Sequence, residues 1–413
     1  MAENGNSNGQ YRGTILVTDA NRGSAISIIR ALGRNHWRVI AADSVPNSLG
    51  FRSRYAAETL LYPAPEHARN EFVDALLQAA RDRHIDLIIP VTDAVIIPLS
   101  EARDRFAGVT MLAIPDKDAL AVVTDKNKTL ALAEQLGVPA PRTCLVATVQ
   151  EAMEQGPPLG WPLVLKPRAS RLYREQEAME AFTVCYAENA EQLAEQMARF
   201  EGRCNVLLQE YYTGEGHGVE LLLDEGRPLA MFQHKRLREI PIHGGASALR
   251  ESVALDSAMV DYATRLMGAL RWTGLAMVEF KVGKAGPKLM EINGRVWGSL
   301  PLAVMSGMDF PSRLADLYLG DTHASNGAPN TSYTVGVKAR NLELDAAWIA
   351  SVLYGKRDYP FFPMPGRGQA VKAVLELFNP RYKYDVQSFE DPQPGLAQIP
   401  KIVRKLAGKV QKI

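Results

Sequence analysis

Two strand-like runs in the second half of the chain carry carboxylates whose spacing would let them act together. Residues 290–295 read Met-Glu-Ile-Asn-Gly-Arg, and apolar and polar side chains alternate there as in a half-buried strand. Glu279 lies in a similar run twelve residues before Glu291, and the turn-forming residues of 283–287 separate the two runs. The pattern predicts a β-hairpin.

A connection of five residues would pair Glu279 with Glu291 and Lys281 with Leu289 across this hairpin. Like charges directly opposite each other destabilise a strand pair unless a cation lies between them. Carboxylate and amide oxygens are ligands that suit Mg²⁺. We therefore predict that Glu279, Glu291 and Asn293 bind magnesium, with Mn²⁺ as an alternative metal.

The hairpin alone leaves a second interpretation open, in which its acids are solvated at the surface or paired with Lys281, Lys288 or Arg295. Two earlier lysines favour the metal site. Lys166 ends an apolar strand-like run, and a lysine in such a place needs an anion. Together with Lys126, it would neutralise phosphates opposite the metal.

Other residues would complete a nucleotide site. The Gly-x4-Gly-Lys phosphate loop is absent from the sequence, so the phosphates must be bound in another way. Arg295 would stabilise charge on a transferred phosphoryl group. The edge of the strand at 205–212 would offer backbone groups to a purine, through Gln209, Glu210, Tyr211 and Tyr212.

The N-terminal part predicts a parallel sheet with helices on both faces, because strands and helices alternate along it. We expect a helix at 69–83 and strands at 14–18, 37–42, 59–62, 87–91 and 109–113. The first turn, 19–24, lacks the three-glycine spacing of a dinucleotide-binding loop, which argues against NAD or FAD.

Five segments follow from these patterns. We expect a disordered tail at 1–12 and an α/β domain at 13–115. The remaining segments are a central α+β subdomain at 116–205, a second α+β subdomain with the acidic hairpin at 206–330, and a C-terminal extension at 331–413. Within the second subdomain we expect an amphipathic helix from about Asp256 to Leu270, with Asp256 as its cap.

Composition limits the classes of function. The net charge of +1 and the lack of a long basic block in the first 390 residues argue against a dedicated nucleic-acid binder. Three cysteines without metal-ligand spacing fit a reducing compartment. The first eleven residues lack the pattern of a signal peptide, so we expect a cytoplasmic protein.

The last stretch, 399–413, predicts a basic amphipathic helix. Such a helix can lie on an anionic membrane, although a terminal helix docked on its own domain is more common. We expect docking and keep peripheral membrane contact as the alternative.

The order of these parts resembles the ATP-grasp superfamily over roughly residues 14–320. Asp125-Lys126 before Gly-Val-Pro-x-Pro is similar to the family's first lysine segment, and Val164-Leu-Lys166-Pro is similar to its second. Residues 208–212 are similar to its adenine hinge, and Glu279 with 290–295 to its magnesium hairpin. The resemblance implies a parallel-sheet domain that precedes a two-subdomain ATP-grasp fold.

More narrowly, the chain resembles carboxylate-amine ligases related to the carbamoyl-phosphate synthase large subunit. The Arg-Leu-Arg-Glu run at 236–239, the Gly-Gly-x-Ser loop at 244–247 and the Trp-Gly-Ser-Leu-Pro run at 297–301 carry this resemblance. We expect Arg236, Arg238 and the Gly244-Gly245 loop to grip a carboxylate substrate, because the two arginines stand just before a flexible segment. Further implied roles are nucleotide contact for His217 and stabilisation of an intermediate for Arg295 and Arg250.

One departure concerns the flap over the phosphates, because residues 168–176 contain no glycine where many relatives are glycine-rich. Two alternatives follow: arginines supply the positive charge instead of a backbone nest, or the flap is loose and does not close over ATP.

The resemblance implies ATP-dependent joining of a small carboxylate to an amine through an acylphosphate, with release of ADP and phosphate, often in a homodimer. Two alternatives remain. One is carbamoyl phosphate formation or carboxylation on bicarbonate, and the other is ATP binding by a non-catalytic regulatory protein.

Overall fold

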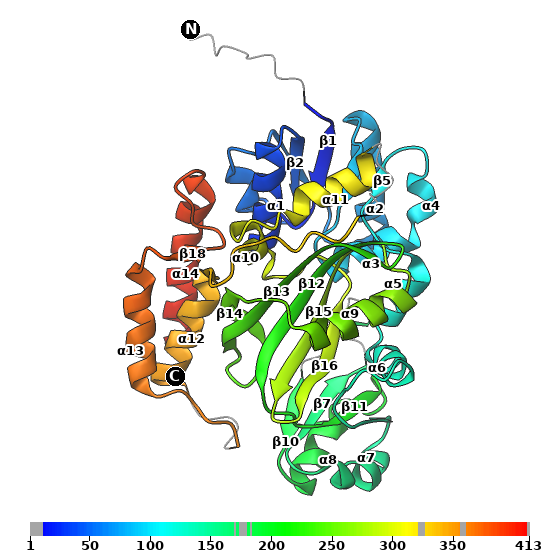
Figure 1. The fold of residues 1–413 in the computed structure, drawn as a ribbon, viewed down its shortest axis with the longest axis vertical. Helices are drawn as coiled ribbons and strands as arrows, with labels where there is room; N and C mark the ends of the chain where they lie inside the picture. The colour runs from blue at the N-terminus through cyan, green and yellow to red at the C-terminus, as the bar shows by residue number, and fades with distance from the viewer. Residues whose placement is uncertain are drawn as a thin grey trace. The chain divides into compact units, whose positions relative to one another are not determined.

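The computed structural model describes residues 11–168, 171–172, 180–181, 184–320, 327–355 and 361–410 (Figure 1). The tail predicted at 1–12 and the flap predicted at 168–176 therefore lie largely outside the described residues. The chain forms two compact units. The first combines residues up to Ile114 with 309–326 and 385–401, and the second combines 115–308, 327–384 and the residues from Ile402 onward.

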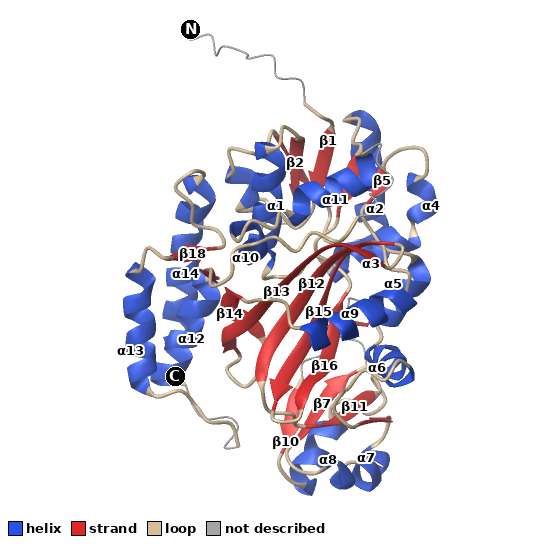
Figure 2. Cartoon of the chain, viewed as in Figure 1, coloured by secondary structure: helices blue, strands red, loops and turns tan. Residues whose placement is uncertain are grey.

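The first unit contains the predicted parallel sheet, with strand order β3-β2-β1-β4-β5 and parallel pairing throughout (Figure 2). Its strands are β1 (Thr14–Val17), β2 (Arg38–Asp43), β3 (Glu58–Leu61), β4 (Leu87–Ile89) and β5 (Met111–Leu112). Its helices include α1 (Gly23–Arg34), η1 (Gly50–Arg52), α2 (Arg69–Asp82), α3 (Asp93–Glu101), α4 (Arg103–Phe106) and α11 (Phe310–Leu319). The α/β fold class expected for this region is confirmed.

A later segment of the chain completes this unit. Arg30 of α1 is buried, and its Nε donates to a carboxylate oxygen of Asp391 at 2.9 Å. Val386 packs into a small apolar cluster with Ile26 and Leu49. Residues near the C-terminus therefore help to hold the N-terminal sheet together.

The second unit contains an antiparallel sheet with strand order β10-β7-β11-β6. Its strands are β6 (Thr143–Val146), β7 (Leu163–Pro167), β10 (Cys185–Ala187) and β11 (Val206–Glu210), and β8 (Arg171–Leu172) pairs separately with β9 (Glu180–Ala181). The neighbouring helices are α5 (Lys117–Val123), α6 (Lys126–Gln135), α7 (Val149–Gln155), η2 (Pro157–Leu159) and α8 (Ala190–Ala198). Because β11 pairs with β6 and β7, the boundary expected at 205 precedes a strand of this same sheet.

A larger sheet follows in the same unit, with strand order β16-β15-β12-β13-β14-β17-β18. Its strands are β12 (Glu215–Asp224), β13 (Arg227–Ile240), β14 (Ala246–Ser252), β15 (Gly274–Gly283), β16 (Gly286–Asn293), β17 (Lys338–Arg340) and β18 (Tyr382–Tyr384). The predicted helix after 256 is α9 (Ser257–Ala269), and the Asp256 side chain caps it by accepting from the Met259 amide.

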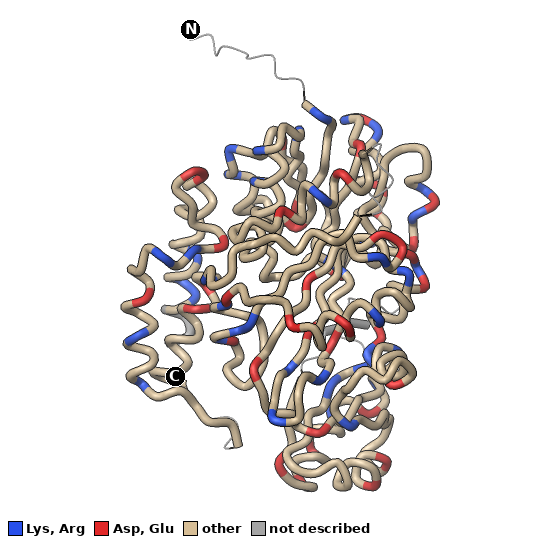
Figure 3. Tube along the Cα trace, viewed as in Figure 1, with Lys and Arg blue, Asp and Glu red and all other residues tan. Residues whose placement is uncertain are grey.

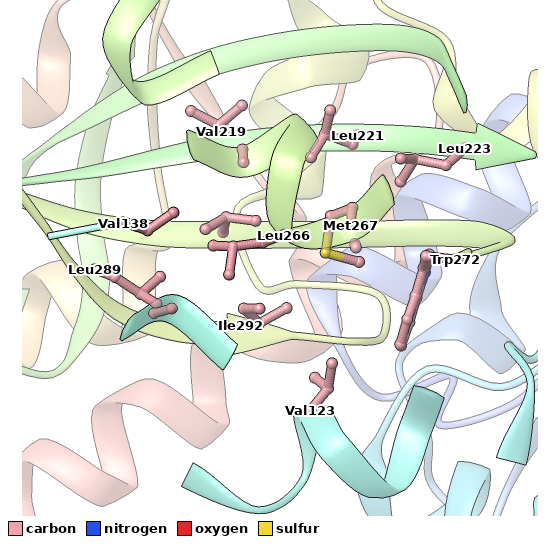
Figure 4. Packing of buried hydrophobic residues seen from close by; sticks show 14 of the residues in the cluster. Val123, Val138, Val219, Leu221, Leu223, Leu266, Met267, Trp272, Leu289 and Ile292 are labelled. Carbon is pink, nitrogen blue, oxygen red and sulfur yellow. The ribbon is translucent and has the colours of Figure 1, made fainter. Parts of the chain in front are cut away.

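The side of this sheet that faces α9 is apolar. Alternate residues of β12, including Val219 and Leu221, pack there with Leu266 of α9 and Ile292 of β16 (Figure 4). Since strand side chains alternate between faces, the polar residues at the intervening positions lie on the opposite side, here called the site face.

The C-terminal extension supplies α12 (Leu342–Tyr354), α13 (Arg367–Leu375), η3 (Glu376–Phe378) and α14 (Pro392–Val410), and α10 (Leu300–Met305) lies earlier in the chain. The predicted C-terminal helix is thus present and begins before 399. Lys405 of α14 forms an ion pair with Glu343 of α12, which is the expected docking on the chain's own domain. None of the helices in the described ranges is long and apolar enough to cross a membrane.

Candidate functional site

The acidic hairpin forms as predicted at its centre, where Glu279 of β15 lies directly opposite Glu291 of β16. The turn differs from the expectation. Lys281 lies opposite Lys288 and not Leu289, because the strands extend to Gly283 and Gly286 and the connection is shorter than five residues. A bulge after Glu279 shifts the register back, so the two carboxylates still face each other.

Arg236 of β13 supplies the positive charge beside these acids. Its guanidinium donates to Glu279 and, at 2.9 Å, to Glu239, and it also donates to the Gly245 carbonyl at 3.2 Å. These contacts hold Arg236 and the Gly244-Gly245 loop, both predicted to grip a carboxylate, at the hairpin.

The two facing acids differ in their proton affinity. Burial raises the pKa of Glu279 above its ordinary value, and Glu291 adds to this, although Arg236 opposes it. Burial also acts to raise the pKa of Glu291, but the charges of Lys126 and Lys166 outweigh it and hold that pKa below its ordinary value. The fields of both predicted phosphate-binding lysines therefore reach the hairpin.

One ion pair connects the two lysine segments. Asp125 caps α6 by accepting from the Asn127 amide at 3.0 Å, and the Arg168 guanidinium donates to the same carboxylate at 2.9 and 2.7 Å. The Lys126 amide donates to the Arg168 carbonyl at 3.2 Å. The start of α6 and the end of β7 are thereby joined, which places the Lys126 and Lys166 segments side by side.

Burial lowers the pKa of Lys166 to about 8. This amine therefore loses its charge as the pH rises through that value. If it binds phosphates, ATP affinity should fall by up to about tenfold per pH unit above the pKa, as calorimetric titration from neutral to alkaline pH would measure. Arg stays charged throughout this range, so Lys166→Arg should flatten the profile, and an unchanged profile in that variant would contradict the assignment.

The segment predicted as the adenine hinge connects the four-stranded sheet to the hairpin. Glu210 accepts from Lys288 at 2.5 Å and from Arg142 at 2.7 Å, and the Tyr212 hydroxyl donates to the Gly286 carbonyl at 2.7 Å. Gln209 is buried and donates to the Thr143 hydroxyl, and the Lys281 amine lies 5.5 Å above the Tyr211 ring.

The structure does not bring His217 to this site. His217 lies opposite Phe280, on the apolar face of the sheet, and its ring contacts Gln233. Gly218, the next residue of β12, lies opposite Glu279 on the site face. Because side chains alternate between the two faces of a strand, the His217 side chain lies on the face opposite to that of Glu279 and Glu291.

Gly218 has a packing role. A Cβ at this position would lie 2.5 Å from Cε1 of His234 and 3.0 Å from Sδ of Met277. Gly218→Ala should therefore destabilise the fold by about 1–3 kcal/mol through overpacking. Chemical denaturation would measure this against Gly298→Ala, whose Cβ would meet nothing within 4 Å; equal stability of the two variants would contradict the prediction.

A buried polar group on the site face escaped the sequence analysis. Nδ1 of His234 lies 2.8 Å from Oε1 of Glu220, and both side chains are fully buried. Burial raises the pKa of Glu220 to about 8 and lowers that of His234 well below its ordinary value. The sequence feature that could have predicted this pair is the single glutamate, Glu220, inside the apolar run of β12, because a buried acid needs a partner.

The other predicted arginines occupy different surroundings. Arg250 is fully buried opposite Arg236, and its charge acts on Glu220. Arg295 follows β16, is half-buried and donates to the Val296 carbonyl at 2.9 Å.

Arg238 is held by the C-terminal extension. Its guanidinium donates to Asp345 at 3.0 Å and to Glu376, and it lies 4.9 Å from the Trp348 ring. A carboxylate substrate would have to displace both acids to reach Arg238.

The donor set fits a magnesium ion shared with phosphates. Among the described residues, no group of three or more His, Cys, Asp and Glu could form an all-protein metal cage. Mg²⁺ is usually bound by one or two carboxylates plus substrate phosphates. Glu279 and Glu291 match that pattern, and Asn293 donates to Glu291 at 3.1 Å, which places its amide beside the carboxylate.

Sequence comparisons relate the chain to known proteins. A family model described as "ATP-grasp in the biosynthetic pathway with Ter operon" matches residues 203–340. The chain is 26% identical to the carbamoyl phosphate synthase large chain of Thermomicrobium roseum over 73% of its own length. It spans 28% of that relative and 26% of the corresponding Thermus thermophilus protein.

Solved structures share the fold. A biotin carboxylase from Campylobacter jejuni superimposes with a TM-score of 0.60 at 19% identity, over 79% of this chain and 74% of that one. An L-amino acid ligase from Bacillus licheniformis gives a TM-score of 0.60 at 15% identity, over 77% of each chain.

Proposed function

This chain carries an ATP-grasp domain homologous to the carbamoyl phosphate synthase large chain, and on that basis we propose that it is an ATP-dependent carboxylate-amine ligase. The observation that carries the proposal is the facing pair Glu279 and Glu291, with the charges of Lys126 and Lys166 acting on Glu291. Phosphoryl transfer depends on the positioning of the reactants and on neutralisation of their charge. Two acids that can bind a metal ion, with the charges of two lysines acting on one of them, can provide both.

In the first step, an oxygen of a small carboxylate substrate attacks the γ-phosphorus of ATP, the bond to the β-phosphate oxygen breaks, and an acylphosphate and ADP form. Lys126 and Lys166 bind the phosphates. Glu279, Glu291 and Asn293 would hold Mg²⁺, or Mn²⁺, which supplies charge neutralisation when bound. Gln209, Glu210, Tyr211 and Tyr212 form the edge against which the adenine lies.

In the second step, the amine nitrogen attacks the acyl carbon, phosphate leaves with the bonding electron pair, and the nitrogen loses a proton. Arg295 stabilises charge on the transferred group and on the tetrahedral intermediate. Arg250 helps to stabilise the same intermediate through the electric field that its charge exerts on the site face.

Arg236 is the better placed of the two arginines proposed to bind the carboxylate substrate. It already binds Glu279 and Glu239, so its guanidinium is oriented toward the hairpin. Arg238 is engaged by Asp345 and Glu376. We therefore assign substrate binding to Arg236 and the Gly244-Gly245 loop, and a positioning role to Arg238.

A screen for ADP release tests the proposal. The full chain, MgATP and a panel of carboxylates with and without amines should give ADP only with a matching pair, and mass analysis should detect the amide product. ADP release with bicarbonate alone would favour the carboxylating alternative. Nucleotide binding without turnover across the panel would favour a regulatory protein.

We also propose that the protein acts in the cytoplasm, forms a homodimer and uses no nucleic-acid partner. Cys144, Cys185 and Cys204 are all free thiols, which suits a reducing compartment. Analytical ultracentrifugation would decide the oligomeric state.

A further inference from the structure

Helix α13 buries its smallest side chains and exposes its largest apolar ones. Ala370 and Ala373 pack in a core with residues of α12, including Trp348 and Ile349. On the outside, 57% of Val371, 38% of Val374 and 68% of Leu375 is exposed, and so is 82% of Phe378, which ends the short helix η3 that follows α13. We call these four residues the α13 stripe.

The α13 stripe is a continuous feature. Val371, Val374 and Leu375 stand at positions i, i+3 and i+4, on one face of α13. Phe378 follows three residues after Leu375 in the 3-10 helix η3, where residues three apart are aligned. Single exposed apolar residues are ordinary in soluble proteins, but a contiguous apolar face marks a surface that meets a partner.

The charges in the segment that carries the stripe are mainly basic. Residues 366–384 contain four basic residues and a single acid, Glu376. That acid is bound to Arg238, so it is already neutralised on the inner side of the segment. The exposed charges of this segment are Arg367, Lys372, Arg381 and Lys383, which we call the basic border, and Figure 3 shows basic positions in blue along α13.

From this geometry we propose that the α13 stripe and its basic border bind the surface of an anionic lipid bilayer. A helix with an apolar stripe flanked by Lys and Arg lies at a membrane interface with its apolar side chains among the lipids. Basic residues near an anionic leaflet add electrostatic attraction to this contact. This surface is distinct from the basic helix predicted at the C-terminus.

Two features of the surface disfavour a second copy of the chain. A symmetric contact would place the same four cations against one another, and like charges in a contact are destabilising. A stable dimer also buries about 800 Å² on each partner, more than one stripe of four side chains provides. An anionic lipid surface can bind both groups of residues, because its acyl chains would contact the apolar side chains and its headgroups would pair with the cations.

Vesicle flotation of the full chain tests the proposal independently of the ligase activity. The wild type should float with vesicles of phosphatidylcholine and phosphatidylglycerol and stay unbound with phosphatidylcholine alone. The double variant Leu375→Asp/Phe378→Asp should lose about tenfold or more of the bound fraction. The control Leu61→Asp, which alters an exposed leucine of β3, should bind like the wild type.

A second readout places the stripe at the lipid directly. In Phe378→Trp, tryptophan fluorescence should be quenched by brominated anionic lipids, and Lys372→Glu/Arg381→Glu should reduce vesicle binding. Thermal melting would show that each variant is folded. Failure of the wild type to bind anionic vesicles, or equal binding by the Asp variant, would overturn the proposal. So would a dimer that Phe378→Asp dissociates, because the stripe would then bind a second copy.

Discussion

Replacing Glu291 by Gln should reduce substrate-dependent ADP release by about 100-fold or more, which is the size expected when a charged group at a phosphoryl-transfer centre is lost. The substitution keeps the shape of the side chain and removes only its charge. That charge matters because Glu291 lies under the fields of Lys126 and Lys166, which hold its carboxylate ionised. A coupled assay for ADP, with the substrate pair found in the screen, would measure the effect.

Glu215→Gln is the matched control, since Glu215 is largely exposed at the start of strand β12 in the same sheet. It should leave the rate unchanged. The Glu291 variant should keep its fold and should require a higher Mg²⁺ concentration for its residual activity. Undiminished turnover in Glu291→Gln would exclude this hairpin as the metal site.

Replacing Asp345 by Ala should cost about 3–5 kcal/mol of unfolding free energy, the usual penalty for leaving a buried charge unpaired. Asp345 is fully buried and accepts hydrogen bonds from two arginines, Arg238 at 3.0 Å and Arg340 at 2.8 Å. Without it, the Arg340 guanidinium would keep a bond to the Glu376 carbonyl but no buried counter-charge from Asp345. Urea denaturation would measure the loss.

The control is Glu343→Ala, in the same helix. Glu343 pairs with the largely exposed Lys405, and exposed pairs contribute at most about 1 kcal/mol. Equal destabilisation by the two substitutions would show that the helix, and not the buried ion pair, is responsible. Recovery of stability in the double variant Asp345→Ala/Arg340→Met would support the conclusion that the unpaired buried charge causes the loss.

Local sequence patterns predicted several of the elements that determine the fold. The parallel pairing in the first sheet, the Asp256 cap and the facing of Glu279 and Glu291 all follow from spacing and alternation within short stretches. The predicted pairing of Lys281 with Leu289 was wrong because the turn is tighter than its glycines and proline suggest. The bulge after Glu279 shifts the register so that Glu279 still lies opposite Glu291, and no local sequence pattern indicates this bulge.

Features that depend on distant segments were harder to predict. Arg238 stands near Arg236 in the sequence, but partners about a hundred residues later determine where its guanidinium lies. His217 follows a glycine-rich stretch that suggests a loop, whereas it belongs to strand β12 and faces the apolar side. The pairing of Glu220 with His234 depends on strand register, which the sequence indicates only through the cost of a lone buried acid.

The contacts between the hinge segment and the hairpin restrict how the two sheets of the second unit can move. Glu210 and Tyr212 bind the hairpin near its turn, and the backbone at Gly283 approaches Thr213 so closely that a Cβ would lie 2.3 Å from its carbonyl oxygen. Because these contacts hold the two sheets together at this end, we expect any separation of the sheets to be a rotation about residues 210–214. The displacement of a side chain would then grow with its distance from these residues, so a small change of angle there would produce the largest movement at the parts of the sheets farthest from them.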